Sequence, residues 1–350
     1  MTRNMQRSFI VSIVNHRQMA WLESCLLSLF EHPYTGGAFE VIVLDNASRL
    51  GSIGPIKERF PQVHIMEQSR WRGFGANHNH VAREASGDLL FLLNPDALVH
   101  EGALDRLAAA LGKDPTTAVA AGPILNPDGS VWRNPPFPFP TPLRALGQAV
   151  GLHRLPERKM SPRMAHTFSN GWVSGSAFLI DRSVFSAFGG FDERFFLYAE
   201  EIDLMFRLTR SGRQIAWVPD AYVTHAGRTS GEAAVDEAGV SAHRLGGFED
   251  RSIVEYVRSK TAYMEKHYGK QGAVTYRLAL SLDASIRLAL ASMPVVRHHL
   301  EARVPHPAVT RHHHFIRLRA AVVPGSGPSV SDLATEWNQR VVAHGKGKSQ

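Results

Sequence analysis

The stretch Asp88–Leu98, DLLFLLNPDAL, decides the fold prediction for this chain. Its five consecutive apolar residues, Leu89–Leu93, lack polar alternation, which is typical of a strand buried on both faces of a sheet. The run stops at Asn94, Pro95 and Asp96, and proline has no amide hydrogen for a central strand to use. We therefore expect a central strand that ends by presenting the Asp96 carboxylate.

Similar apolar runs alternate with helical patterns before this stretch. The predicted strands and helices are Phe9–Val14, Met19–Glu31, Val41–Leu44, Pro55–Phe60, Val63–Met66 and Ala76–Ala85. Short apolar strands between helices favour a mostly parallel sheet with helices on both faces. The sequence therefore predicts an α/β fold.

Polar residues follow three of the predicted strands. They are Asn15 and His16 after the first strand, Asp45, Asn46 and Ser48 after the second, and Asp96 after the fourth. An aspartate at such a position is often only a turn former or a helix cap. Because ligands of parallel sheets bind beyond the carboxyl ends of the strands, the concentration of polar residues there predicts one binding crevice.

The stretch RGFGANHN follows the third strand and contains Gly73 and Gly75. A dinucleotide fingerprint needs a third glycine where His78 stands and should follow the first strand, which disfavours a nucleotide-dependent oxidoreductase. Two interpretations remain open. Either the glycines let the backbone approach a phosphate or sugar while Asn77 offers its amide, or the segment is a plain turn before a capped helix.

A second group of polar residues begins a helical pattern near residue 200. Glu200, Glu201 and Asp203 occupy its first turn, and Asp203 can pair with Arg207 four residues later. The helix dipole alone accounts for acidic residues at this position. Two adjacent carboxylates after the aromatic run FFLY also favour a raised pKa and base catalysis.

Composition narrows the class of protein. The chain has 350 residues, 44% of them hydrophobic, and its one cysteine, Cys25, excludes a disulfide framework and a cysteine-based metal cluster. The apolar run after the basic N-terminus is too short for a signal core, so we expect a cytoplasmic location. Residues 251–350 hold 15 basic and 6 acidic residues, against 24 and 26 in the rest. This asymmetry predicts a basic appendage that binds anionic lipid or a phosphate-bearing substrate. We expect no nucleic acid as a partner.

The segment Gly272–Met293 is largely apolar but contains Arg277, Asp283 and Arg287, which favours an amphipathic helix over a spanning one. This helix either packs on the body of the protein or lies peripherally on the inner face of the membrane. We expect residues 1–250 to form the body of the protein, with one half at about 8–125 and the other at about 126–250. Residues 251–322 should form a basic helical extension, and residues 323–350 a linker and a disordered tail.

Six ordered motifs resemble glycosyltransferase family 2, in particular its rhamnosyltransferase-like branch. They are VLDNAS, GFGANHN, LLNPDA, VSGSAFLI, GGFDERFFLYAEEIDL and VTHAGRTS, between about Phe9 and Ser230. The resemblance implies a GT-A fold, a nucleotide-sugar donor and inversion at the anomeric carbon.

The resemblance also implies roles in donor binding. Asp45 matches an aspartate that hydrogen-bonds the pyrimidine base, and Asp96 matches the last aspartate of the DxD element that holds Mg²⁺ or Mn²⁺ on the diphosphate. The first aspartate of that element is replaced by Asn94, which weakens the expected metal site. The expected donor-binding residues are Asn15, Asp45, Asn46, Ser48, Gly73, Gly75, Asn77, Asn94 and Asp96.

Further roles concern catalysis. Glu201 stands where the family usually carries an aspartate base, and the choice between Glu200 and Glu201 as the base stays open. His225 matches a histidine that completes the metal site in some relatives, although a structural role suits it as well. Basic loop residues such as Arg228 could assist the departing diphosphate, although such an arginine is more commonly a solvated surface residue.

The resulting hypothesis is an inverting, metal-dependent glycosyltransferase. Its first candidate reaction moves rhamnose from dTDP-rhamnose, within a class of dTDP- or UDP-sugar donors. The expected acceptor is a saccharide or a polyprenyl-diphosphate-linked saccharide in bacterial surface polysaccharide synthesis. The alternative is a non-catalytic protein of the same fold that binds nucleotide sugars or scaffolds a membrane assembly.

Overall fold

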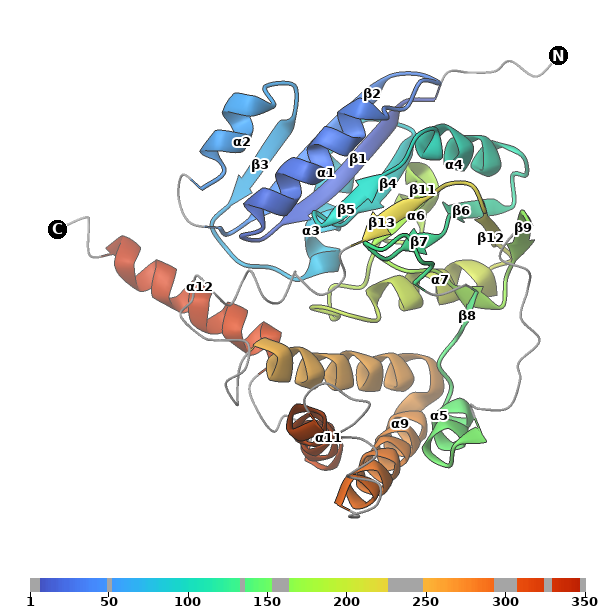
Figure 1. Ribbon diagram of the computed structural model, residues 1–350, viewed down its shortest axis with the longest axis vertical. Helices are drawn as coiled ribbons and strands as arrows, with labels where there is room; N and C mark the ends of the chain where they lie inside the picture. The colour runs from blue at the N-terminus through green and yellow to red at the C-terminus, as the bar shows by residue number, and fades with distance from the viewer. Residues whose placement is uncertain are drawn as a thin grey trace.

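The computed structural model describes residues 7–48, 52–132, 136–152, 164–225, 248–292, 307–323 and 329–346. Strands and helices alternate through its first part, as the apolar runs predict (Figure 1). The elements of this part are β1 (Phe9–Asn15), α1 (Met19–Glu31), β2 (Phe39–Asn46), α2 (Gly54–Arg59), β3 (His64–Gln68), α3 (Phe74–Glu84), β4 (Leu89–Leu93), β5 (Ala97–Val99), α4 (Ala103–Gly112), β6 (Thr117–Ala121) and β7 (Ile124–Leu125).

The second part adds further strands and the C-terminal helices. Its elements are β8 (Phe137–Pro138), α5 (Pro142–Ala149), β9 (His166–Phe168), β10 (Gly171–Trp172), β11 (Ala177–Asp181), α6 (Arg182–Ala187), α7 (Glu200–Arg210), β12 (Gln214–Trp217), β13 (Val223–His225), α9 (Phe248–Ser292), α11 (Pro307–Val322) and α12 (Val330–Lys346).

The central sheet has eight strands in the order β3-β2-β1-β4-β11-β6-β12-β9. The strands β3, β2, β1 and β4 are mutually parallel, whereas β11 runs antiparallel to both of its neighbours. All five residues of β4 are buried, as expected for a strand in the middle of a sheet. The carboxyl ends of β1, β2 and β4 consequently lie side by side at one edge.

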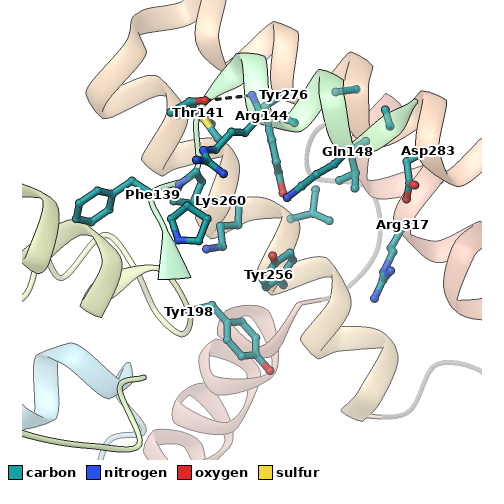
Figure 2. Close-up of a pocket in the computed structure, with 18 of the residues that line it drawn as sticks. Phe139, Thr141, Arg144, Gln148, Tyr198, Tyr256, Lys260, Tyr276, Asp283 and Arg317 are labelled. Carbon is teal, nitrogen blue, oxygen red and sulfur yellow. Dashed lines mark hydrogen bonds between the residues drawn. The ribbon is translucent and has the colours of Figure 1, made fainter. Parts of the chain in front are cut away.

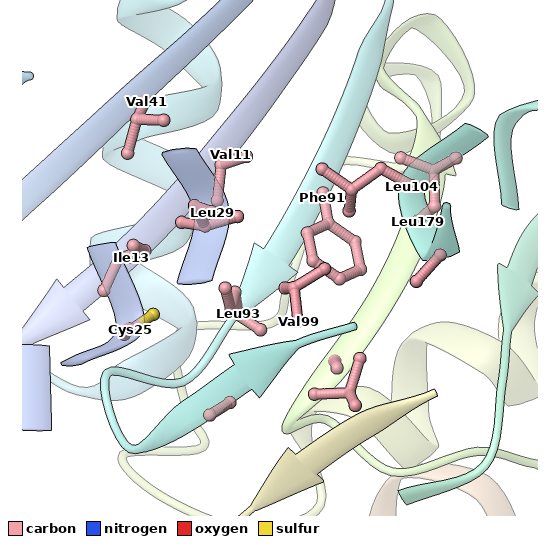
Figure 3. Close-up of a cluster of buried hydrophobic side chains, with 14 of the residues drawn as sticks. Val11, Ile13, Cys25, Leu29, Val41, Phe91, Leu93, Val99, Leu104 and Leu179 are labelled. Atoms are coloured by element: carbon pink, nitrogen blue, oxygen red, sulfur yellow. The ribbon is translucent and has the colours of Figure 1, made fainter. Parts of the chain in front are cut away.

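Alternate side chains of these strands enter two hydrophobic cores. Val11, Phe91 and Leu93 point to the face covered by α1 and α4 (Figure 3), whereas Ile10 and Leu92 point to the opposite face. Full burial of each such side chain contributes about 1.5–3 kcal/mol to folding. This two-sided burial explains why β4 has no polar residues.

The C-terminal helices pack together on one side of this sheet domain (Figure 1). Helix α9 has a kink at Gly269, where φ is 69° and ψ is −177°, and it packs against both α5 and α11. On its second arm, Ala273, Tyr276 and Ala279 are buried, while Val274 and Leu278 are about half exposed or more. One face of the expected amphipathic helix therefore packs on the protein and another face remains exposed. Within the described residues, none of the helices has the length and apolar character that crossing a bilayer requires.

Buried Asp203 connects α7 to α9. Its carboxylate lies 2.9 Å from Arg207 Nε on the same helix, which confirms the predicted pair, and 2.6 Å from Lys266 Nζ and 2.8 Å from His267 Nε2 on α9. These ion pairs hold the helical extension against the sheet domain.

Helix α12 contradicts, for residues 330–346, the prediction that residues 323–350 form a linker and a disordered tail. Residues 324–328 and 347–350 of that prediction lie outside the described residues. The Asp332 carboxylate accepts a hydrogen bond from Ser329 N at 2.8 Å, and Ser329 Oγ accepts one from Asp332 N at 3.2 Å. This reciprocal arrangement is a capping box. The prediction was wrong because the small polar residues before α12 resemble a linker, although Ser-x-x-Asp also signals a helix start.

Candidate functional site

Three of the expected residues form one hydrogen-bonded group, the Asp45 cluster, made of Asn15, Asp45 and Ser48. Asn15 pairs with Asp45 across β1 and β2, and its Nδ2 donates to Asp45 Oδ1 at 3.0 Å. Ser48 Oγ accepts a hydrogen bond from Arg17 N at 3.0 Å. Burial raises the pKa of Asp45, while hydrogen bonds from Ser48 and Asn15 act against this rise. The strand ends thus converge as the sequence predicts.

Trp71 forms a wall beside the Asp45 cluster and was not identified from the sequence. Its ring stacks on His16 at a centroid distance of 4.1 Å and an interplanar angle of 18°. His16 Nδ1 lies 2.6 Å from the carbonyl oxygen of Asn46, and burial lowers the pKa of His16 to about 4, so the ring is neutral near pH 7. The aromatic residue before the glycines in RWRGFG was the available signal.

Asn46 and Asn77 support the Trp71 segment. Asn46 Oδ1 accepts from Arg72 N at 2.9 Å, and the Nδ2 atoms of Asn46 and Asn77 both donate to Arg72 O. Gln68 Nε2 donates to both asparagine oxygens. Both asparagines, expected as donor ligands, therefore have a positioning role in this structure.

Gly73 and Gly75 have a packing reason for lacking a side chain. A Cβ on Gly73 would lie 2.6 Å from the carbonyl oxygen of Phe196, and one on Gly75 would lie 2.8 Å from Phe191 Cβ. Phe74 N donates to the same Phe196 oxygen at 2.8 Å. The glycines thus bring the start of α3 against the segment that precedes α7.

The turn after β4 meets the end of β13. His225 is the register partner of Ala97, and its Nε2 lies 3.1 Å from Asp96 Oδ1 and 3.1 Å from Asn94 Nδ2. The structure therefore brings together all three residues expected around the metal. Arg228 lies outside the described residues.

The donor set of this group fits a divalent cation only in part. A carboxylate, an imidazole and an amide are acceptable ligands for Mn²⁺, and Mg²⁺ favours the oxygen donors. Among the described residues no group of three His, Cys, Asp or Glu side chains is placed to hold a metal ion. Asp96 and His225, with the Asn94 amide beside them, are therefore the described residues that could supply ligands to a divalent cation here.

Glu200 and Glu201 begin α7 directly after two residues in the left-handed region, Tyr198 at φ 70° and Ala199 at φ 71°. Such backbone is costly for residues with side chains and is concentrated at functional sites. Glu200 is 5% exposed, whereas Glu201 is half-buried. The Oε2 atoms of both have no hydrogen-bond partner among the described residues.

The electrostatic environment separates the two carboxyls. Burial and the neighbouring Glu201 charge raise the pKa of Glu200 well above its ordinary value. Burial also raises the pKa of Glu201, and the Lys260 ammonium lowers the pKa of both carboxyls, whereas only the rise at Glu200 is enlarged by a neighbouring carboxylate. Glu201 is therefore the more accessible and the more readily ionised of the pair.

One short loop, Ser174–Ser176, lies between the Asp96 turn and the carboxylates. Asn94 N donates to Ser176 O at 2.9 Å, and a Cβ added to Gly175 would lie 3.4 Å from Glu201 Cβ. The loop separates β10 from β11, which lie in different sheets. It places Glu201 on the same side of the sheet domain as Asp96.

Sequence comparisons identify relatives of this chain. The model of glycosyl transferase family 2 matches residues 8–187. The N-acetylglucosaminyl-diphospho-decaprenol L-rhamnosyltransferase of Mycobacterium tuberculosis is 32% identical over 208 residues, which make up 53% of this chain and 66% of that protein. The O-antigen biosynthesis protein RfbC of Myxococcus xanthus is 28% identical over 232 residues, or 62% of this chain and 17% of that protein. The chain thus spans just under two thirds of the first relative.

Solved structures share the fold at low identity. The mannosyltransferase PcManGT from Pyrobaculum calidifontis, in complex with GDP-Man and Mn²⁺, has a TM-score of 0.56 and 17% identity, covering 91% of this chain and 86% of its own. GalNAc-T7 with UDP, GalNAc and Mn²⁺ has a TM-score of 0.52 and 17% identity, covering 99% and 58%. These likenesses confirm the expected GT-A fold.

Proposed function

The chain belongs to glycosyl transferase family 2, and on this premise we propose that it moves a sugar from a nucleotide donor to an acceptor in glycan biosynthesis. The first donor that we propose is dTDP-rhamnose, because the M. tuberculosis relative is a rhamnosyltransferase. The proposed acceptor is a saccharide on a polyprenyl diphosphate, since that relative is named for a diphospho-decaprenol acceptor.

The observation that carries this proposal is the Ser174–Ser176 loop, which contacts the Asp96 turn on one side and Glu201 on the other. A glycosyl transfer with inversion needs a base close to the acceptor and a binding site for the departing diphosphate on the opposite side of the sugar. The loop fixes the distance between two groups that suit these tasks.

In the proposed reaction the donor's base lies against the Asp45 cluster and Trp71. Asp96 and His225, with Asn94 beside them, would hold Mg²⁺ or Mn²⁺. The cation would stabilise the negative charge that the nucleoside diphosphate gains as it leaves.

Glu201 acts as the general base. Its Oε2 atom, which has no hydrogen-bond partner among the described residues, accepts the proton of the acceptor hydroxyl. The hydroxyl oxygen bonds to the anomeric carbon as the bond from this carbon to the diphosphate breaks. Glu200, which is more deeply buried and whose pKa is raised further, is the one of the pair that holds a proton more strongly, and it positions the start of α7.

We further propose peripheral contact with the inner face of the cell membrane. Exposed apolar side chains follow one another along α5 and the second arm of α9: Leu143, Leu146, Val150, Val274, Leu278, Leu282, Ile286 and Leu290. The surplus of basic residues in 251–350 would favour anionic lipid head groups.

Purified protein incubated with a panel of nucleotide sugars, a lipid-linked saccharide acceptor and Mg²⁺ or Mn²⁺ tests the proposed function. Release of nucleoside diphosphate together with an extended acceptor is the expected result, with dTDP-rhamnose the best donor. Donor binding without turnover for every combination would instead support the non-catalytic alternative.

A further inference from the structure

A groove of about 720 Å³ lies between the helical extension and the sheet domain. Residues of α5, α9 and α11 line it, and Tyr198 lines it just before α7 (Figure 2). No residue expected to bind the donor or the metal belongs to its lining. The groove is therefore distinct from the donor crevice.

The inner end of the groove reaches the catalytic carboxylates. Lys260, which is 5% exposed, lines the groove and is close enough to Glu200 and Glu201 to change the pKa of both. Trp172 also lines this end, and it comes shortly before the Ser174–Ser176 loop that contacts Glu201. A hydroxyl group held at this end would lie near the proposed base.

The walls of the groove are aromatic and apolar. They include Phe139, Trp172, Tyr198, Tyr256 and Tyr276, and Lys260 Nζ lies 5.4 Å from the ring centroids of both Trp172 and Tyr256. Aromatic faces of this kind bind sugar rings and hydrocarbon chains through apolar contact.

Positive charge is concentrated in the same groove. Arg144, Lys260, Arg287 and Arg317 line it, against one acidic residue, Asp283, which lies 2.7 Å from Arg287 Nε. Figure 2 shows Arg144 and Lys260 extending into the space between α5 and α9, and Arg317 on the same side of that space as Asp283. Arginine is well suited to phosphate because its planar group can form two parallel hydrogen bonds.

Both helices beside the groove also carry exposed apolar side chains. Leu143 and Leu146 of α5 are 78% and 39% exposed, and Leu278 and Leu282 of α9 are 64% and 43% exposed. A hydrocarbon chain that leaves the groove would therefore meet apolar side chains on both helices.

We infer that this groove binds the phosphate-bearing lipid part of the acceptor, an isoprenoid diphosphate. The inference rests on the proposed function, which sets the order in which the sugar, the diphosphate and the isoprenoid of the acceptor lie along the groove. The acceptor sugar lies at the Trp172 and Lys260 end, the diphosphate lies among Arg144, Arg287 and Arg317, and the isoprenoid follows the apolar sides of α5 and α9.

Direct binding tests the groove without requiring turnover. The full-length protein, free of divalent metal, is titrated calorimetrically with farnesyl diphosphate below its micellar concentration, and separately with farnesol and with inorganic diphosphate. We expect farnesyl diphosphate to bind at least about tenfold more tightly than either fragment. Equal affinity for inorganic diphosphate would mean a plain anion site, and equal affinity for farnesol a plain apolar surface; either result overturns the inference.

Charge reversal locates the site. Arg287→Glu combined with Arg317→Glu should weaken farnesyl diphosphate binding at least about tenfold, whereas Lys113→Glu, on the exposed end of α4, should leave it unchanged. The milder pair Arg287→Gln with Arg317→Gln replaces the first pair if circular dichroism shows that it does not fold. Unchanged affinity in folded variants contradicts the inference.

Turnover then separates this inference from the proposed function. With a lipid-diphosphate acceptor, the arginine variants should raise KM for the acceptor and leave the donor Kd and kcat close to the parent values. With an alkyl glycoside of the same sugar, which has no phosphate, their KM should not change. Transfer without any such difference refutes the groove site alone, whereas diphosphate-lipid binding without transfer by the parent protein refutes the proposed function alone.

Discussion

The side chain of Asn338 forms two hydrogen bonds with the backbone of Trp71, although 267 positions separate them. Asn338 Oδ1 accepts from Trp71 N at 2.7 Å and Asn338 Nδ2 donates to Trp71 O at 3.0 Å. The neighbouring Trp337 packs against Arg17, whose guanidinium lies 4.2 Å from its ring centroid. Helix α12 thus contacts both Trp71 and Arg17, whose backbone N donates to Ser48 of the Asp45 cluster, so the C-terminal segment is part of the proposed donor site.

Asn338→Ala should weaken donor binding about three- to tenfold, because Trp71 loses the two hydrogen bonds that fix its backbone. Calorimetric titration with dTDP-rhamnose or dTDP measures the effect. Thr335→Ala on the same helix is the matched control, since the Thr335 hydroxyl contacts only Ser331 O of its own helix. Equal donor affinity in the two variants would show that α12 does not shape the donor site.

Glu201→Gln should lower kcat by about 10²–10⁴-fold and leave the donor Kd unchanged, because an amide cannot accept the proton. Glu200→Gln should lower kcat by less than about tenfold, since a protonated carboxyl and an amide are similar in charge and shape. Glu201→Asp, which introduces the family's usual residue, should retain activity. The reverse order of the two glutamine variants would identify Glu200 as the base.

Asp96→Asn should abolish metal-dependent turnover, whereas Asn94→Asp should tighten metal binding by adding a second carboxylate. Titration of the activity with Mn²⁺ measures both. Gln62→Glu adds the same charge in an exposed turn before β3, at the opposite end of the parallel strands from Asp96, and should change nothing. Full activity of Asp96→Asn at every Mn²⁺ concentration would remove Asp96 from the metal site.

The activity should have an acidic limb at a higher pH than an ordinary glutamate gives. Burial raises the pKa of Glu201, and the base is lost as the pH falls through this raised value. Lys260 opposes the rise, so Lys260→Met should move the limb to still higher pH while Lys260→Arg keeps it in place. The pH dependence of kcat at saturating acceptor measures this shift, and identical profiles for the methionine variant and the parent would contradict the assignment.

The strand ends and the Asp45 cluster could be predicted because their signals are local. Apolar runs identify buried strands, and a parallel sheet gathers the residues that follow them, so Asn15, Asp45 and Asp96 were placed correctly from spacing alone. The glycines illustrate a limit of this reasoning. The same sequence RGFG fits a phosphate loop or a close backbone contact, and only the position of Phe196 favours the latter.

Contacts between distant segments could not be predicted. Lys260 approaches Glu201, and Asn338 reaches Trp71, through the packing of helices whose mutual orientation no local pattern encodes. The start of α12 differs, because its Ser329-x-x-Asp332 capping box was readable. The small polar residues that precede α12 were interpreted as a linker, and the capping box was therefore not used to predict a helix.

The Asp203 network should make the largest electrostatic contribution to the stability of the joined domains. Asp203→Asn should lower the free energy of unfolding by about 3 kcal/mol, because it removes the buried carboxylate that pairs with Arg207 and Lys266 and that lies 2.8 Å from His267 Nε2, leaving Lys266 with Asp192 alone. Asp283→Asn removes an i,i+4 pair of similar geometry near the surface and should cost only about 0.3–0.5 kcal/mol. Urea unfolding at pH 7 compares the free energies of unfolding of the two variants.

Burial would raise the pKa of Asp203, but His267, Lys266 and Arg207 outweigh it and lower the pKa below the ordinary value. This stabilisation is therefore complete above the ordinary aspartate pKa of about 4 and is lost as the pH falls through the lower folded value. The gap between the parent and Asp203→Asn should narrow below about pH 4, and a gap that instead widened on acidification would exclude a charged Asp203 as its cause.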